Sequence, residues 1–168
     1  ACPRTLKRRS CSQKIKDATQ LMTDILYQNM ELADYPEVSA LWKSTENIGL
    51  SAADQIDQIE RFLVRNPALS FVARQNRRLV GAVLCGHDGR RGAIYHLAVV
   101  DTHRRKGIGR QLVLRCLQAL QSAGIERCHI HVYAQNQSGI NFWQHESWFL
   151  RPELVLLSID IDKNSAYS

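Results

Sequence analysis

The residues best suited to bind a charged ligand stand together in the stretch DTHRRKGIGR, Asp101 to Arg110. The stretch follows the apolar run IYHLAVV and precedes QLVLRCLQALQSAG, whose apolar residues recur at helical spacing. A helix N-terminus offers unpaired backbone N–H groups and a partial positive charge, and glycines let an anion approach that backbone closely. The pattern therefore predicts a pyrophosphate site, although a solvated basic turn before an ordinary helix would carry the same charges.

Two well-known phosphate-binding patterns do not fit this stretch. The chain contains no P-loop string Gly-x-x-x-x-Gly-Lys-Ser/Thr, and the third glycine of the dinucleotide fingerprint would fall on Leu112. That fingerprint also turns directly off its strand, whereas six residues separate Val100 from Gly107. If this stretch binds a phosphate, it does so as a different kind of loop.

The wider string LAVVDTHRRKGIGRQLV resembles the acetyl-CoA-binding motif of the GNAT family of N-acetyltransferases. That motif is Arg or Gln, two variable residues, Gly, a variable residue, then Gly or Ala, and here Arg104, Gly107 and Gly109 meet it. The family's order of elements extends over residues 25–161. The resemblance implies an N-acetyltransferase that moves acetyl from the cosubstrate acetyl-CoA to a primary amine, in a small molecule or a protein or peptide. Transfer would be direct, within a ternary complex and without a metal.

The resemblance also implies which positions contact the cofactor. The strand LAV would pair through its backbone with the pantetheine arm, and the loop with the helix start would cradle the pyrophosphate. A second region, NQSGINFWQHESW, matches the part of the family that often supplies a cofactor-contacting Asn. The residues so assigned are Leu97, Ala98, Val99, Arg104, Arg105, Lys106, Gly107, Ile108, Gly109, Arg110, Asn136 and Trp143.

Two departures from the family pattern stand out, of which Ser147-Trp148 in place of the usual Gly-Phe is one and the other bears on catalysis. Many members carry a Tyr that protonates the leaving thiolate, and the matching position here is Trp143. Because an indole is no general acid at neutral pH, that role is vacant or filled elsewhere. A non-catalytic acyl-CoA-binding module is therefore the alternative to an enzyme.

Two neighbouring residues are the candidates for catalysis. Strand alternation puts Tyr95 on one face with Ala93 and Leu97, and in the resemblance this face points toward the acceptor. Tyr95 is therefore the first candidate, acting by itself or by holding a water, although a strand aromatic could equally be core packing. His96 is the runner-up, because an imidazole titrates near neutrality but alternation places this one on the other face unless a bulge re-aims it.

The apolar spacing predicts a fold of the α/β class, of α+β type, in a single GNAT-like domain. We expect a central mixed, mostly antiparallel sheet flanked by helices and splayed between the strands 93–100 and 127–133. Residues 1–24 would form a partly helical extension, and residues 25–168 the acetyltransferase-like domain. In chain order, the expected elements are a helix over 13–22, a strand over 24–30, helices over 32–44 and 51–66, strands over 69–75, 78–87 and 93–100, a helix from Ile108 that stops at Gly124, a strand over 127–134, a capped helix over 136–147 and a final strand over 153–161.

Composition narrows the partners. The formal charge of +6 favours anionic ligands, but the basic residues are dispersed without an aromatic platform, so we expect no nucleic-acid partner. No apolar run is long enough to cross a bilayer. Five scattered cysteines indicate reduced thiols and a cytoplasmic location.

Two further features leave alternatives open. His129 and His131 would share one face of a strand, but no third ligand at suitable spacing accompanies them, so we expect no metal. The final strand could close the sheet or pair across a homodimer.

Overall fold

The computed structural model describes residues 25–161, in two compact units that meet in the sequence between His131 and Val132. The expected helix over 13–22 and the rest of the extension 1–24 lie outside the described residues. None of the described helices is long and apolar enough to cross a membrane.

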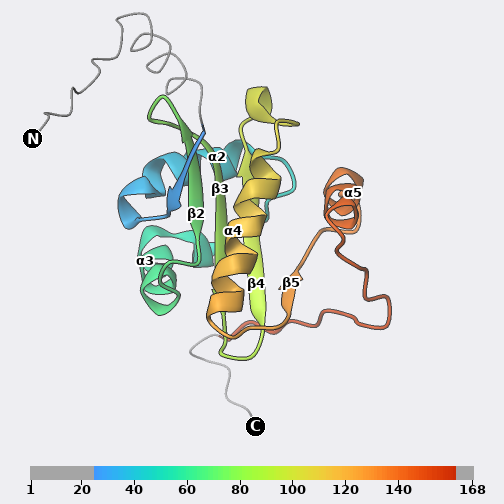
Figure 1. The fold of residues 1–168 in the computed structure, drawn as a ribbon. Helices are drawn as coiled ribbons and strands as arrows, with labels where there is room; N and C mark the ends of the chain where they lie inside the picture. Colours follow the sequence, from blue (N-terminus) through green and yellow to red (C-terminus); the bar gives the residue numbers. More distant parts are fainter. Residues whose placement is uncertain (1–24, 162–168) are drawn as a thin grey trace, which may run out of the picture. The chain divides into compact units, whose positions relative to one another are not determined.

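The first unit is built on a five-stranded sheet in the order β1-β2-β3-β4-β5 (Figure 1). β1 to β4 are antiparallel neighbours, and β5 runs parallel to β4, so the predicted mixed, mostly antiparallel sheet is confirmed. The β2–β3 turn places Asn76 and Arg77 in the left-handed region, with φ of 50° and 66°. The strands are β1 (Leu26–Asn29), β2 (Phe71–Gln75), β3 (Arg78–His87), β4 (Gly92–Val99) and β5 (Cys128–Ile130).

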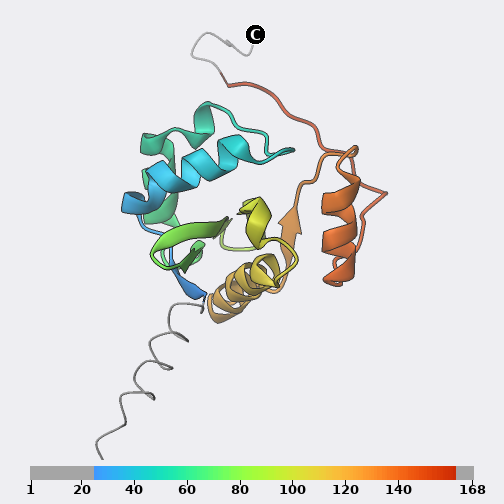
Figure 2. The ribbon, with the colours of Figure 1, turned by 90° about the horizontal axis from the view of Figure 1, so that it is seen from above.

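Helices cover both faces of this sheet. The helices α2 (Tyr35–Ser44) and α3 (Ile56–Arg65) lie on one face and α4 (Ile108–Ser122) on the other, as Figure 2 shows. Three short 3₁₀ turns connect them: η1 (Leu32–Asp34), η2 (Ala52–Asp54) and η3 (Asp101–His103). The single helix predicted over 51–66 is wrong, because Gln55 is extended, with φ −70° and ψ 156°, and separates η2 from α3.

The core fills the space between the sheet and its helices. On the α2 and α3 face, Trp42 and Val38 are buried with Leu84 and Ala98. On the α4 face the helix approaches the strands so closely that a Cβ at Gly92 would lie 2.6 Å from Leu120 Cδ1. That close contact fixes the C-terminal part of α4 against the start of β4. The start of α4 packs on β3, where a Cβ at Gly81 would lie 3.2 Å from Ile108 Cγ2.

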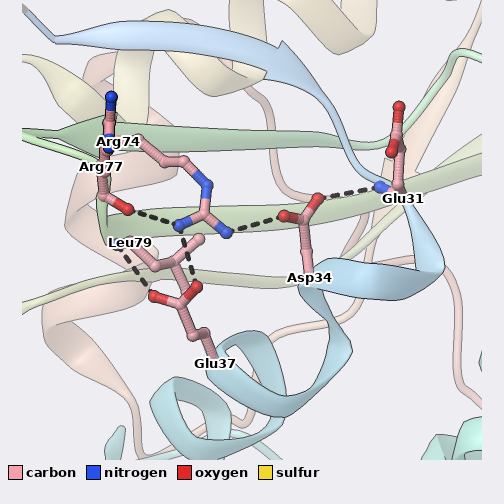
Figure 3. Close-up of polar contacts among 6 residues, drawn as sticks. All are labelled: Glu31, Asp34, Glu37, Arg74, Arg77 and Leu79. Atoms are coloured by element: carbon pink, nitrogen blue, oxygen red, sulfur yellow. Dashed lines mark hydrogen bonds and ion pairs between the residues drawn. The ribbon is translucent and has the colours of Figure 1, made fainter.

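A polar cluster attaches α2 to the β2–β3 hairpin (Figure 3). The Arg74 guanidinium lies 2.7 Å from Asp34 Oδ1 and 2.9 Å from Glu37 Oε1, and it also donates to the carbonyl of Arg77. Glu37 accepts in addition from the backbone N–H of Leu79. Hydrogen bonding to the buried Asp34 is the largest influence that raises the pKa of Arg74. The cluster therefore anchors the start of the helix that carries Trp42.

The second unit contains the helix α5 (Gln137–His145), which confirms the predicted short helix. Asn136 caps it, since its side-chain oxygen accepts from the N–H of Gly139 at 2.9 Å. The final strand predicted over 153–161 is wrong: this segment has no regular secondary structure, and its apolar side chains are exposed. The described residues of this unit include no strand with which it could form backbone hydrogen bonds.

Candidate active site

The loop between β4 and α4 has the backbone of an anion site. Arg105 and Gly107 both adopt left-handed conformations, with φ of 63° and 78°, and Gly107 is the N-cap of the 15-residue α4. No side chain of residues 25–161 caps this helix, and its first turn carries no acidic residue. A Cβ at Gly107 would have open space around it, with nothing within 4 Å. The N-terminal N–H groups and the positive end of the helix dipole therefore face room that a phosphate could fill.

The basic side chains of the loop divide into two kinds. Arg104 is used within the loop: its Nε donates to the carbonyl of Val99 at 3.1 Å, and its Nη2 lies 2.7 Å from Asp101 Oδ1. Arg105 and Lys106 are exposed, and Arg110 is exposed in the first turn of α4. Positive charge thus surrounds the helix start, while Arg104 shapes the loop.

Two other residues of the motif, Ile108 and Gly109, can offer a ligand only backbone groups. Ile108 is 1% exposed and belongs to the core, so its backbone N–H is the group it can offer a ligand. Gly109 follows it inside the first turn of α4. The local fold is therefore set by the core as much as by the charges.

The strand before the loop has a backbone edge without a strand partner. β4 and β5 pair over three positions only, from Gly92 with Cys128 to Ile94 with Ile130. Beyond Ile94, no described strand of the first unit lies along that edge of β4, which carries Leu97, Ala98 and Val99. The strand predicted over 127–134 is accordingly shorter, since β5 ends at Ile130, opposite Ile94.

The strand β4 contains a β-bulge. The register with β3 passes from Ala82 opposite Ala98 to Leu84 opposite Tyr95, so two residues, His96 and Leu97, oppose Val83 alone. His96 has φ 50°, which is rare for a residue with a side chain. The alternation predicted for this strand is therefore wrong from His96 onward.

The bulge puts both catalytic candidates on the α2 and α3 face of the sheet. The ring of Tyr95 meets Phe62 of α3 edge to face, with centroids 6.0 Å apart, and Tyr95 remains 39% exposed. The ring of His96 lies 5.0 Å from that of Trp42 in α2. The bulge that sequence alternation could not place is what brings these two side chains together.

The environment of Tyr95 keeps its hydroxyl protonated. Burial raises the pKa of Tyr95, and the neighbouring Cys85, Cys128 and Asp88 raise it further. At neutral pH this side chain is a hydrogen-bond donor or acceptor and carries no charge. It can therefore line a reaction centre or hold a water, but it cannot serve as a base.

His96 has an acidic partner that sequence reasoning did not find. His96 Nε2 lies 2.6 Å from Oδ1 of Asp54, in the η2 turn 42 residues earlier. Tyr35 of α2 donates its hydroxyl to the backbone carbonyl of Asp54 at 2.9 Å. Ser51 precedes Asp54 by three residues, a spacing typical of a helix cap, but nothing in that spacing indicates a contact with His96.

A buried polar atom lies in the same region. Trp42 is 1% exposed, and its indole Nε1–H has no hydrogen-bond partner within residues 25–161. Buried N–H groups are rarely left unpaired. One buried hydrogen-bond donor near His96, the Trp42 indole N–H, therefore lacks an acceptor in the described part of the chain.

The remaining predicted cofactor residues lie in the second unit. Trp143 is 7% exposed, with ring centroids 5.1 Å from Phe142 and 4.9 Å from Trp148. Asn136 uses its side-chain oxygen as the cap of α5. Both residues therefore hold the second unit together, whatever else they contact.

The described residues show no metal centre. Within residues 25–161, no group of three or more His, Cys, Asp or Glu side chains is arranged to hold a metal ion. His129 lies in β5, and His131 follows the strand on an exposed segment. The described cysteines, Cys85, Cys116 and Cys128, are free thiols.

Comparison with known proteins agrees with this geometry. The Acetyltransferase (GNAT) family profile matches residues 35–146. An acetyltransferase of Sodalis glossinidius is 28% identical over 134 residues, which cover 80% of this chain and 94% of that protein. In fold, the chain is similar to Ard1 from Thermoplasma volcanium, with a TM-score of 0.67, 16% identity, and 76% of this chain and 84% of that one covered.

A second solved structure carries the cofactor. The PaiA N-acetyltransferase from Thermoplasma acidophilum, in complex with coenzyme A, has a TM-score of 0.63 and 18% identity, covering 74% of this chain and 89% of that one. The profile match spans the helices, the bulged strand and the glycine loop described above. The chain therefore belongs to the GNAT family of acetyltransferases.

Proposed function

We propose that the protein transfers the acetyl group of acetyl-CoA to a primary amine of a small molecule, a protein or a peptide, directly within a ternary complex. The single observation that carries this proposal is the uncapped N-terminus of α4, which begins at the left-handed Gly107 immediately after the bulged strand β4. The acetyltransferase relatives and the coenzyme A complex of a similar fold support the choice of ligand.

The fold offers separate groups for each part of the cofactor. The backbone N–H groups at the start of α4, with Arg105, Lys106 and Arg110 around them, would hold the pyrophosphate. The edge of β4 at Leu97, Ala98 and Val99 would hydrogen-bond the pantetheine arm as an added strand does. Asn136 and Trp143 stay assigned to the cofactor by the family pattern. When bound, acetyl-CoA supplies the activated acyl group as a thioester.

The reaction requires two protons to leave the nitrogen of an ammonium acceptor. Once the first proton is removed, the amine nitrogen attacks the thioester carbon, a C–N bond forms and the C–S bond breaks. The departing thiolate takes up the second proton that the nitrogen loses. We assign proton removal to His96 and give Tyr95, which is protonated at neutral pH, the task of lining the centre or holding a water. Holding both reactants together provides much of the acceleration. No metal is needed for these steps.

Two measurements on the purified chain test the proposal. Acetyl-CoA and CoA should raise the melting temperature, whereas ATP and NADH at equal concentration should not, because only a ligand that binds the folded state shifts unfolding. Thiol release from acetyl-CoA should then depend on the addition of an amine. Equal stabilisation by all four anions, or none, would overturn the proposed cofactor site.

A non-catalytic acyl-CoA-binding module is the second candidate. It is favoured by Trp143, which is packed against Trp148 where many family members carry an acidic Tyr. This candidate predicts the same thermal stabilisation but no thiol release with any small amine, peptide or protein acceptor. The two candidates therefore differ in the second measurement alone.

The cysteines support a reducing compartment. Cys85, Cys116 and Cys128 are free thiols, and burial is the main cause that raises the pKa of Cys128 to about 12. Free thiols persist where glutathione and thioredoxin keep them reduced. We therefore propose that the reaction takes place in the cytoplasm.

A further inference from the structure

The carboxylate of Asp54 is held so that one oxygen faces His96. Its Oδ2 accepts from the backbone N–H of Ser51 at 2.8 Å and lies 3.4 Å from the Ser51 hydroxyl, which closes the capping box of η2. Its Oδ1 lies 2.6 Å from His96 Nε2. Tyr35 holds the backbone of the same residue through the Asp54 carbonyl. Three residues, Ser51, His96 and Tyr35, thus hold Asp54, whose exposed side-chain fraction is 13%.

His96 is equally constrained but has one nitrogen to spare. The bulge holds its backbone at φ 50°, and Trp42 packs against its ring. Only Nε2 has a polar partner: no hydrogen bond joins Nδ1 to any of residues 25–161. Nδ1 is not among the buried unpaired atoms of the described chain, so solvent or a ligand can reach it.

We infer that Asp54 is a positioning residue for acetyl transfer, which sets the tautomer of His96 and makes Nδ1 the atom that takes the proton. A carboxylate accepts hydrogen bonds only, so the hydrogen of the neutral ring belongs on Nε2 and the lone pair on Nδ1. When the acceptor ammonium loses a proton to Nδ1, the resulting imidazolium is stabilised by the Asp54 carboxylate. This inference rests on the proposed function, because it names how that site handles the proton.

The substitution Asp54→Asn separates this role from a structural one. The amide oxygen can still accept from Ser51 and keep the η2 cap, while the amide NH₂ donates toward His96 Nε2. The ring must then carry its hydrogen on Nδ1, which removes the lone pair that the reaction needs. A carboxylate-to-amide change beside a catalytic histidine acts in this way in the serine proteases.

The first test needs no substrate. Nitrogen-15 NMR of the labelled free protein, with the His96 signals assigned by loss in His96→Gln, distinguishes the two neutral tautomers. We expect Nε2–H in the unsubstituted protein and Nδ1–H in Asp54→Asn. Either an Nδ1–H tautomer in the unsubstituted protein or an unchanged tautomer in the variant would overturn the inference.

The second test measures transfer. Asp54→Asn should lower kcat by about 100-fold while the thermal shift given by acetyl-CoA stays the same. The matched control is Asp57→Asn, which removes the same charge from an exposed position in the first turn of α3 and should leave kcat unchanged. Retention of kcat in Asp54→Asn overturns this inference alone. Absence of amine-dependent thiol release in the unsubstituted protein overturns the proposed function, and with it the role of Asp54, while the tautomer remains measurable.

Discussion

The indole of Trp42 lies against the imidazole of His96, with ring centroids 5.0 Å apart and planes tilted by 58°. Trp42 comes from α2 and His96 from the bulge of β4, so this contact joins the helical layer to the strand that carries both catalytic candidates. It also leaves the Trp42 Nε1–H buried without a partner among residues 25–161. Trp42 can therefore affect His96 through the packing of its ring.

Trp42→Phe should weaken both stability and catalysis. The smaller ring leaves a partly filled space, which should lower the free energy of unfolding by about 1–3 kcal/mol, but it breaks no hydrogen bond of the described residues. Because His96 loses part of its wall, we expect kcat to fall at least about fivefold, the equivalent of roughly 1 kcal/mol.

Urea unfolding and amine-dependent thiol release measure the two effects of this change. Trp148→Phe, an aromatic truncation in the second unit, is the comparison for stability. An unchanged kcat in Trp42→Phe would show that the ring is core packing only.

Gly107→Ala should separate backbone strain from cofactor binding. Gly107 has φ 78° and no atom within 4 Å of a built Cβ, so alanine meets no clash there but must adopt a left-handed conformation, at a cost of about 1 kcal/mol. The added methyl group would stand where the pyrophosphate approaches. We expect the Kd for acetyl-CoA to rise at least about tenfold, or roughly 1.4 kcal/mol.

The chain supplies a matched control for this change. Gly89, in the β3–β4 turn, has φ 92° and likewise nothing within 4 Å of a built Cβ. Gly89→Ala should therefore lower stability by a similar amount without changing the Kd, as measured by isothermal titration. Equal losses of acetyl-CoA affinity in both variants would contradict an anion site at Gly107.

The parts of the fold that could be predicted are those with a local signal. The helix from Ile108 and the cap at Asn136 each depend on residues a few positions apart, and the structure has them where the sequence indicated. The prediction of one helix over 51–66 was wrong because nothing in the sequence at Gln55 indicates that its backbone is extended. The strand over 153–161 failed because alternation indicates a surface suited to pairing without indicating a partner.

The candidate site likewise has one part with a local sequence signal and one part without such a signal. The loop from Arg104 to Gly109 is contiguous, so its glycines and charges could be read directly from the sequence. The contact between Asp54 and His96 joins positions 42 apart and depends on a bulge, which shifts every later side chain of β4 by one face. Alternation alone placed His96 on the wrong side and left Asp54 with nothing to contact.

Cys128 should be slow to react in the folded protein. Burial first, and then Cys85, raise its pKa from the ordinary thiol range to about 12, so the reactive thiolate is scarce at pH 8. We expect iodoacetamide to modify Cys128 at least about 100-fold more slowly in the native chain than in urea, since each pKa unit lowers the thiolate fraction about tenfold. Peptide mass spectrometry would follow this residue separately from the other cysteines.

The raised pKa of Cys128 also determines the direction in which the free energy of unfolding changes with pH. Because the folded pKa is raised, the contribution of Cys128 is fully present below the ordinary thiol pKa and is lost as the pH rises from there toward about 12. Cys128→Ser cannot ionise in this range, so its stability should fall less steeply above pH 9. Identical alkaline slopes for the two proteins would contradict the raised pKa.

Arg74→Ala should destabilise the chain through Asp34. Removal of the guanidinium leaves the carboxylate of Asp34, a buried residue, with only the backbone N–H of Glu31, and it also releases Glu37 from its ion pair. A buried charge without its partner typically costs about 3–5 kcal/mol, and the partial exposure of this cluster places the expected loss near the lower end.

Arg78→Ala is the matched control, because it removes the same charge from an exposed position of the same hairpin. Urea unfolding should show a loss of about 3 kcal/mol for Arg74→Ala and less than about 0.5 kcal/mol for Arg78→Ala. Since the cluster anchors the helix that carries Trp42, the kcat of Arg74→Ala should fall as well, whereas equal stabilities in the two variants would show that Arg74 and Asp34 contribute no more than a surface pair.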